Sequence, residues 1–188
     1  DENRHFFLTH YNRETFEFAL ENMPQIRSLF KIENIEVWIT NDRNEVDNVR
    51  DIVAFADLGE SERLTTESVN PNPNGPTDFR GNPLPDNSAN DLYSRLLNNP
   101  RVREIDQAVS VLQSGQFQMQ QSTDFEKVSA RKLRPSEYNV HPQLGYISLN
   151  VNVQPDQVVG VAFQYSYNGK NYKVGELSIN QESTEPDS

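Results

Sequence analysis

The chain has 188 residues, of which 28 are acidic and 17 basic, giving a formal net charge of −11, and it has no cysteine. The length suits one ordinary domain, and the acidic balance disfavours nucleic acid or anionic lipid as a partner, because Lys and Arg bind both. The absence of cysteine excludes thiol nucleophiles, disulfides and thiolate zinc sites. No run approaches the roughly 20 apolar residues of a membrane helix, so we expect a segment that does not span a membrane.

The amino-terminal part predicts a strand and a helix. Residues 5–10, "HFFLTH", favour a short strand. We expect Asn12 to cap a helix that Pro24 ends. The apolar stripe of this helix comprises Phe16, Ala19, Leu20 and Met23.

The next two strands carry apolar residues on both faces. In residues 35–41, "IEVWITN", alternation places Ile35, Val37 and Ile39 on one face, and the only tryptophan, Trp38, on the face assigned to water. Residues 51–58, "DIVAFADL", are apolar on both sides and end at Gly59. These strands therefore either lie between two covering layers or present aromatic side chains at a surface.

Residues 65–90 form a Pro/Asn-rich loop. Prolines at 71, 73, 76, 83 and 85 exclude a regular element. Long loops without secondary structure in compact domains are usually either functional or disordered. Two interpretations stay open, a mobile connector and an ordered lid packed through Phe79 and Leu84.

The remainder predicts a helical hairpin followed by strands. Ser88 and Asp91 resemble a capping box before a first helix, and a second helix ends at Ser114 and Gly115. Residues 125–133 and 144–151 alternate as strands. Asn168-Gly169 predicts a type I′ hairpin turn. Its register pairs Tyr167 with Lys170, Tyr165 with Tyr172, and Phe163 with Val174.

This order of elements predicts an α+β fold, a largely antiparallel β-sheet with a helical hairpin and an N-terminal helix packed on it. We expect residues 1–180 to form a single soluble domain and residues 181–188 a disordered acidic tail.

No pattern in the sequence indicates catalysis, a cofactor or a metal. His5, His10 and His141 have no metal-ligand spacing, and an EF-hand alignment on Asn70 fails because position 12 is Gly81. Carboxylate pairs such as Glu60 and Glu62 are expected by chance in so acidic a chain. We therefore expect no enzyme, no catalytic residue and no cofactor.

Aromatic residues on the predicted strands are the remaining candidates for a site. The candidate partner contacts are Trp38, Tyr165, Tyr167 and Tyr172. Tryptophan and tyrosine are favoured anchors of protein interfaces. The alternative is that helices or the Pro/Asn-rich loop cover these side chains within the domain, and for Trp38 we favour that alternative.

Four spaced motifs resemble one protein family. They are "IENIEVWITN" at 32–41, "VRDIVAFADLGE" at 49–60, "ARKLRPSEYNVHPQLGYISLN" at 130–150 and "VVGVAFQYSYNGKNYKVGEL" at 158–177. In this order they are similar to the soluble N-terminal-type domain of the SprA/Sov family, the very large outer-membrane translocons of type IX secretion and gliding motility in Bacteroidota. The resemblance spans nearly the whole chain, apart from the Pro/Asn-rich loop and the tail.

The resemblance implies a non-catalytic accessory domain of a barrel that exports folded proteins. Its implied partners are a barrel protein at the lateral gate, a plug protein and the secreted cargo. The implied location is the outer membrane of a Gram-negative bacterium, with this domain extracytoplasmic and only the parent chain spanning the membrane. A second hypothesis is a stand-alone extracytoplasmic module that binds glycans through Trp38 and the tyrosines. A hydrolase is the third and least favoured.

Overall fold

The computed structural model describes residues 4–21, 28–60 and 69–178. Its elements in chain order are β1 (His5–Phe7), α1 (His10–Ala19), β2 (Phe30–Thr40), β3 (Val49–Phe55), α2 (Leu92–Leu97), the 3₁₀ helix η1 (Pro100–Arg103), α3 (Ile105–Gln113), β4 (Phe125–Lys132), the 3₁₀ helix η2 (Pro135–Glu137), β5 (Tyr138–His141), β6 (Tyr146–Leu149), β7 (Val159–Tyr167) and β8 (Lys170–Val174). No helix in these ranges is both long and apolar enough to cross a membrane.

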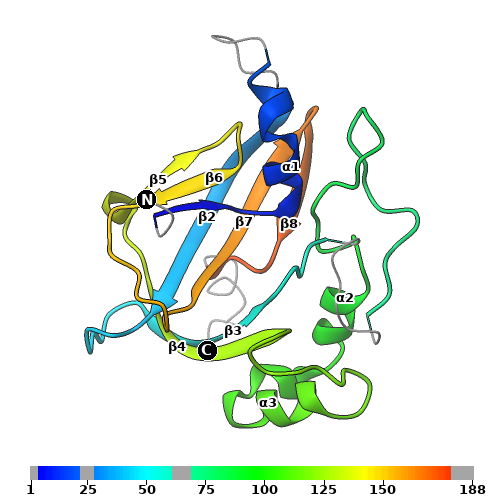
Figure 1. Ribbon diagram of the computed structural model, residues 1–188. Coiled ribbons are helices and arrows are strands. Elements are labelled where there is room, and N and C mark those ends of the chain that lie inside the picture. Colours follow the sequence, from blue (N-terminus) through cyan, green and yellow to red (C-terminus); the bar gives the residue numbers. More distant parts are fainter. Residues whose placement is uncertain (1–3, 22–27, 61–68, 179–188) are drawn as a thin grey trace, which may run out of the picture.

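Two antiparallel sheets form the centre of the fold. The larger has the order β3-β4-β2-β7-β8, and the smaller has the order β1-β6-β5 (Figure 1). Strand β2 pairs with β4 on one side and with β7 on the other. The structure thus confirms the predicted α+β class with mostly antiparallel strands.

The smaller sheet covers one face of the larger sheet. Val37 and Ile39 on β2 are almost fully buried against Ile147 and Leu149 on β6. Further along the same face, Phe30 and Ile32 join Phe163 and Tyr165 of β7 in a second apolar cluster. The alternation read in residues 35–39 therefore assigned this face to the core correctly.

The helical hairpin lies at the far end of the ribbon formed by β3 and β4 (Figure 1). Here Phe125 of β4 packs in a third apolar cluster with Leu92 of α2 and Leu112 of α3. Val53 and Phe55 of β3 pack against the same cluster. The helices thus cover the apolar residues of this ribbon that lie beyond the edge of the smaller sheet.

The β7–β8 hairpin matches its prediction in turn and register. Asn168 and Gly169 both have positive φ, 48° and 80°, as a type I′ turn requires. Phe163 pairs with Val174, Tyr165 with Tyr172 and Tyr167 with Lys170.

Several local predictions need correction. Thr9, rather than Asn12, caps α1, and Asn12 lies in its first turn with its backbone N–H bonded to the Thr9 side chain. Helix α2 begins at Leu92, with Asp91 at its N-cap position but without a side-chain capping bond. The N–H of Leu92 donates instead to the Asn90 side chain at 2.9 Å, so Ser88 and Asp91 do not form the predicted capping box. Strand β5 lies between the predicted strands 125–133 and 144–151, in a stretch to which the sequence assigned no element. Met23, Pro24, residues 65–68 and the predicted tail lie outside the described residues.

Candidate functional site

Trp38 lies in the interior of the domain. Its exposed fraction is 7%, and its indole Nε1 donates a hydrogen bond to Oε2 of Glu36 at 3.2 Å. The guanidinium of Arg50, on β3, lies 5.9 Å from the centre of the indole ring. The structure therefore favours the internal alternative for Trp38, since Arg50 of β3 lies over its ring and Glu36 of the same strand accepts its indole N–H.

Glu36 organises this second face of β2. Its exposed fraction is 4%, and its Oε1 accepts hydrogen bonds from the backbone N–H of Ser178 at 2.8 Å and from the Ser178 hydroxyl at 2.7 Å. The ammonium of Lys132 lies 3.5 Å away. Burial raises the pKa of this carboxyl, but the bonds from Ser178 together with Lys132 and Trp38 outweigh burial and hold the pKa below its usual value.

The candidate tyrosines are also mostly buried. Tyr165 has no exposed surface, and its ring stacks on Phe30 with the centroids 4.2 Å apart. Its hydroxyl donates to the carbonyl of Pro85, and burial raises its pKa strongly. Tyr167 is 8% exposed, whereas Tyr172 is half-buried with its ring 5.4 Å from that of Tyr165. Trp38, Tyr165 and Tyr167 therefore have little surface to offer a partner.

The described part of the Pro/Asn-rich loop, residues 69–90, packs on the larger sheet. Leu84 is 1% exposed and belongs to the same apolar cluster as Tyr165. Asn87 lies at the outer edge of β8 and makes two hydrogen bonds there. Its backbone N–H donates to Lys173 O at 2.8 Å, and its side-chain oxygen accepts from the N–H of Gly175 at 2.8 Å. The loop therefore covers a strand edge that would otherwise be open to pairing, in agreement with the ordered-lid interpretation for Leu84.

A buried carboxylate fixes the tip of this loop. Asp78 is 6% exposed, and its Oδ1 accepts from the N–H groups of Arg80 and Asn82 at 2.9 and 2.8 Å. Its Oδ2 accepts from the Tyr11 hydroxyl on α1 at 2.9 Å. The Tyr167 hydroxyl accepts the N–H of Phe79 at 2.9 Å. The tip is thus tied to α1 and to β7.

The fixed tip presents a phenylalanine to solvent. Phe79 is 67% exposed, and its ring lies 6.0 Å from that of Phe18 on α1. The guanidinium of Arg80 lies 4.2 Å from the centre of the Phe18 ring, and Leu29 is 49% exposed at the start of β2. We call Phe18, Leu29, Phe79 and Arg80 the Phe79 patch. The lid interpretation was therefore wrong for Phe79, which does not pack inward.

The Phe79 patch borders a shallow hollow between α1, β2 and the loop tip. Its volume is about 30 Å³, room for a water molecule or two. Tyr11 and Asp78 line its floor and are already bonded to each other.

Side chains that could ligate a metal meet at one place among the described residues. His10, Asp57 and Glu60 each offer a ligand atom, and these atoms lie within 4.8 Å of one another. The sequence showed no sign of this group, because His10 is far in sequence from Asp57 and Glu60. His5 and His141 lie elsewhere and contact Ser148 and the ring of Tyr146.

The comparisons with known proteins add no relative. No family model matches the chain, and none of the curated proteins matches it.

Proposed function

We propose that this chain is a non-catalytic, soluble protein-contact domain of an outer-membrane translocon of the SprA/Sov kind, which exports proteins in type IX secretion and gliding motility in Bacteroidota. The domain is extracytoplasmic, and its partners are the lateral-gate barrel protein, the plug protein or the secreted cargo. Catalysis and a cofactor form no part of the proposal.

The location of the four family-like motifs in the fold supports the proposal. Residues 32–41 include most of β2, residues 49–60 include β3, and residues 158–177 include β7 and β8. Residues 130–150 include the end of β4 together with β5 and β6. The resemblance therefore concerns strands of both sheets, which pack on one another, and not an isolated short motif.

The observation that carries a contact role is the exposure of Phe79 at a fixed position. The Phe79 side chain is 67% exposed. Four hydrogen bonds to Asp78 and one to Tyr167 hold the loop around it. A side chain held on a fixed backbone loses little entropy on binding, which favours association. Aromatic residues and Arg are enriched at protein interfaces, and both occur in the Phe79 patch.

The glycan-binding alternative has less support. It relied on Trp38 and the tyrosines as stacking platforms, yet Trp38, Tyr165 and Tyr167 are at most 8% exposed. Stacking on a sugar requires an open ring face. We therefore keep the protein-contact function as the single proposal.

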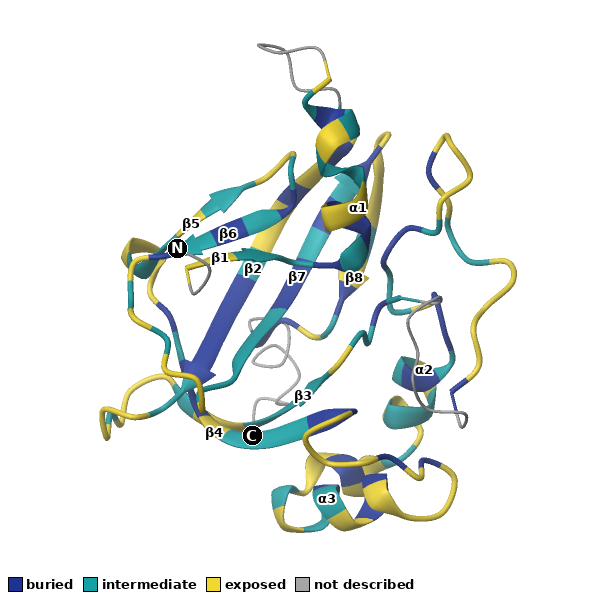
Figure 2. Ribbon diagram, viewed as in Figure 1, coloured by how far each residue is buried: buried dark blue, intermediate teal, exposed yellow. Residues whose placement is uncertain are grey.

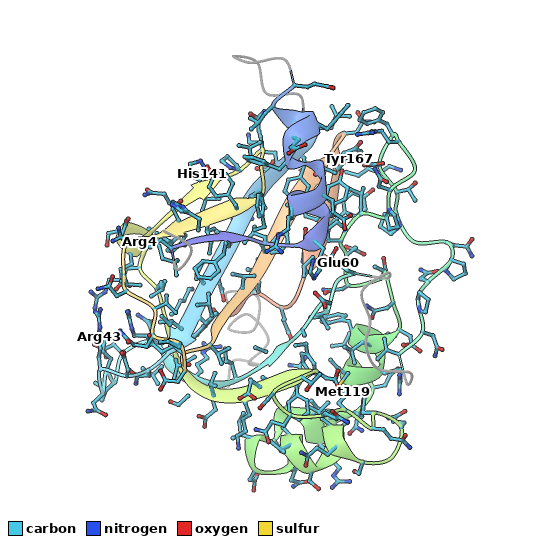
Figure 3. All side chains as sticks on the ribbon, in the orientation of Figure 1. Arg4, Arg43, Glu60, Met119, His141 and Tyr167 are labelled. Carbon is cyan, nitrogen blue, oxygen red and sulfur yellow. The ribbon has the colours of Figure 1, made fainter. Side chains whose placement is uncertain are left out.

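The test is protein export in the bacterium that carries the gene. We expect deletion of the segment to abolish secretion of cargo bearing the C-terminal signal domain. A finer test is Phe79→Ala, compared with Val46→Ala, which removes an 89% exposed apolar side chain from the connection between β2 and β3. Figure 3 shows Arg43, in that connection, on the opposite side of the view from Tyr167.

We expect Phe79→Ala to reduce co-purification of the barrel and plug proteins or the cargo, and Val46→Ala to leave it unchanged. Normal export from a strain without the segment would refute the translocon function. Equal effects of the two substitutions would refute the Phe79 patch as the contact site while leaving the translocon function open to the deletion test.

A further inference from the structure

The turn after β3 meets the amino-terminal end of α1 in a group of three side chains. His10 is the first residue of α1, and its Nε2 lies 3.0 Å from Oδ1 of Asp57. Glu60 accepts the backbone N–H groups of His10 at 2.7 Å and of Tyr11 at 3.2 Å, one with each carboxylate oxygen. Figure 3 shows Glu60 near the base of α1.

Two carboxylates and one imidazole leave this group short of positive charge. Among the described residues, His10 is the sole ion-pair partner of Asp57, and Glu60 has no cationic side chain within ion-pair distance. The end of α1 contributes only about half a positive charge. A bound cation would relieve the unfavourable negative charge of this group.

We propose that His10, Asp57 and Glu60 bind one divalent transition-metal ion, with Zn²⁺ as the best match. Imidazole nitrogen and carboxylate oxygen are both ligands of zinc, whereas Mg²⁺ and Ca²⁺ prefer oxygen alone. Ligands 2.0–2.2 Å from one ion lie about 3.4 Å apart in a tetrahedral site. The three ligand atoms lie within 4.8 Å of one another, so small side-chain rotations bring them to that spacing around one ion.

The surroundings hold the ligands in place and leave them accessible. The Asn90 side chain donates to the carbonyls of Leu58 at 2.8 Å and Glu60 at 3.2 Å, and the N–H of Asp86 donates to Gly59 O at 2.8 Å. These bonds fix the turn independently of the metal. The side chains of His10 and Asp57 are 37% and 27% exposed, so an ion can enter and water can complete its coordination. The ion would join α1 to the turn after β3 and is not assigned a catalytic role.

The test is a calorimetric titration of the tag-free, chelator-treated chain with Zn²⁺. We expect one ion per chain with a dissociation constant in the micromolar range or below. His10→Gln and Asp57→Asn should each weaken binding at least about tenfold, since loss of even an outer-shell partner costs 10–100-fold. His5→Gln is the matched control, because His5 contacts Ser148 and lies outside the group, and it should bind as the unmodified chain does.

A second measurement keeps the result independent of folding defects. The Nε2–Oδ1 contact can persist in Asp57→Asn, and circular dichroism identifies any variant that has unfolded. Co²⁺ in place of Zn²⁺ should give visible absorption bands that Asp57→Asn removes and His5→Gln retains. Binding weaker than millimolar, equal binding by His10→Gln and His5→Gln, or a preference for Ca²⁺ over Zn²⁺ would overturn the proposal. None of these outcomes bears on the protein-contact function.

Discussion

The central sheet and the Pro/Asn-rich loop are ordered by different interactions. In the sheet, backbone ladders join β2 to β4 and β7, and residues 36–39 of β2 are buried on both faces of the strand. In residues 69–90 the backbone forms no ladder, only isolated bridges such as Thr77 with Pro83 and single bonds such as that from Gly81 N–H to Asp78 O. Asn and Asp side chains supply many of the other bonds. Figure 2 shows the contrast, with continuous burial toward the carboxyl-terminal end of β2 and stretches of exposed residues in the loop.

The two regions differ in whether a second layer covers their aromatic side chains. A strand within a sheet places each side chain on a face that another layer can cover, and here even the polar side of β2 is covered through Glu36. A loop tip held by one buried carboxylate has no such second layer. The aromatic side chain that alternation assigned to water, Trp38, is therefore inside, and Phe79, which the ordered-lid interpretation placed inside, is outside.

The largest effect is expected where the two regions meet, at Tyr165. Tyr165→Ala removes a fully buried ring stacked on Phe30, and we expect it to lower the free energy of unfolding by about 4 kcal/mol. Tyr165→Phe keeps the ring and removes only the hydroxyl bond to Pro85, so about 1 kcal/mol is expected. Urea denaturation measures both. Similar losses in the two variants would show that the bond to the loop, and not the ring, dominates.

The second effect concerns the tip of the loop. Asp78→Ala leaves the Tyr11 hydroxyl and the N–H groups of Arg80 and Asn82 without their acceptor. Bonds to a charged acceptor each contribute about 1.5–3 kcal/mol, and water can replace part of them, so we expect a loss of about 3 kcal/mol. Amide hydrogen exchange should accelerate in residues 77–83 first. Unchanged exchange there would mean that the tip is held by other contacts.

A smaller and pH-dependent effect is expected on the polar face of β2. Because the folded-state pKa of Glu36 is lowered, its ionised form stabilises the fold above the unfolded-state pKa, and this contribution is lost as pH falls through the folded-state pKa. Glu36→Gln should cost about 2 kcal/mol at pH 7 and flatten the acid limb of a stability-against-pH curve. A variant with the same acid limb as the unmodified chain would show that Glu36 does not titrate in this way.

The smallest stability effect is expected at the exposed aromatic side chain. Phe79→Ala should change the free energy of unfolding by less than about 0.5 kcal/mol, because the side chain is 67% exposed. A thermal melt checks this, and Val46→Ala gives the reference for an exposed apolar residue. Loss of partner binding without loss of stability would identify Phe79 as a contact residue. A large loss of stability would instead place Phe79 with the core of the sheet.

Local sequence patterns predicted much of the sheet. Alternation in residues 35–39 identified the face that packs on the smaller sheet, and Asn168-Gly169 determined the β7–β8 register. These predictions held because the two-residue period of a strand and the positive φ of a type I′ turn are local properties. Strand β5 was missed because Tyr138–His141 is short and follows Pro135, and pairing with β6 is what makes it a strand.

The sequence by itself determined the fold class, the acidic surface and the strands of the core, since composition and short-range periodicity encode them. The tertiary structure alone decided which aromatic side chains are exposed and which polar groups meet. Trp38 is covered because Arg50, from β3, lies over its ring and because Ser178, near the end of the described chain, bonds Glu36, the acceptor of the indole N–H. His10 meets Asp57 and Glu60 for the same reason, because contacts between distant segments depend on how the layers pack and leave no periodic pattern in the sequence.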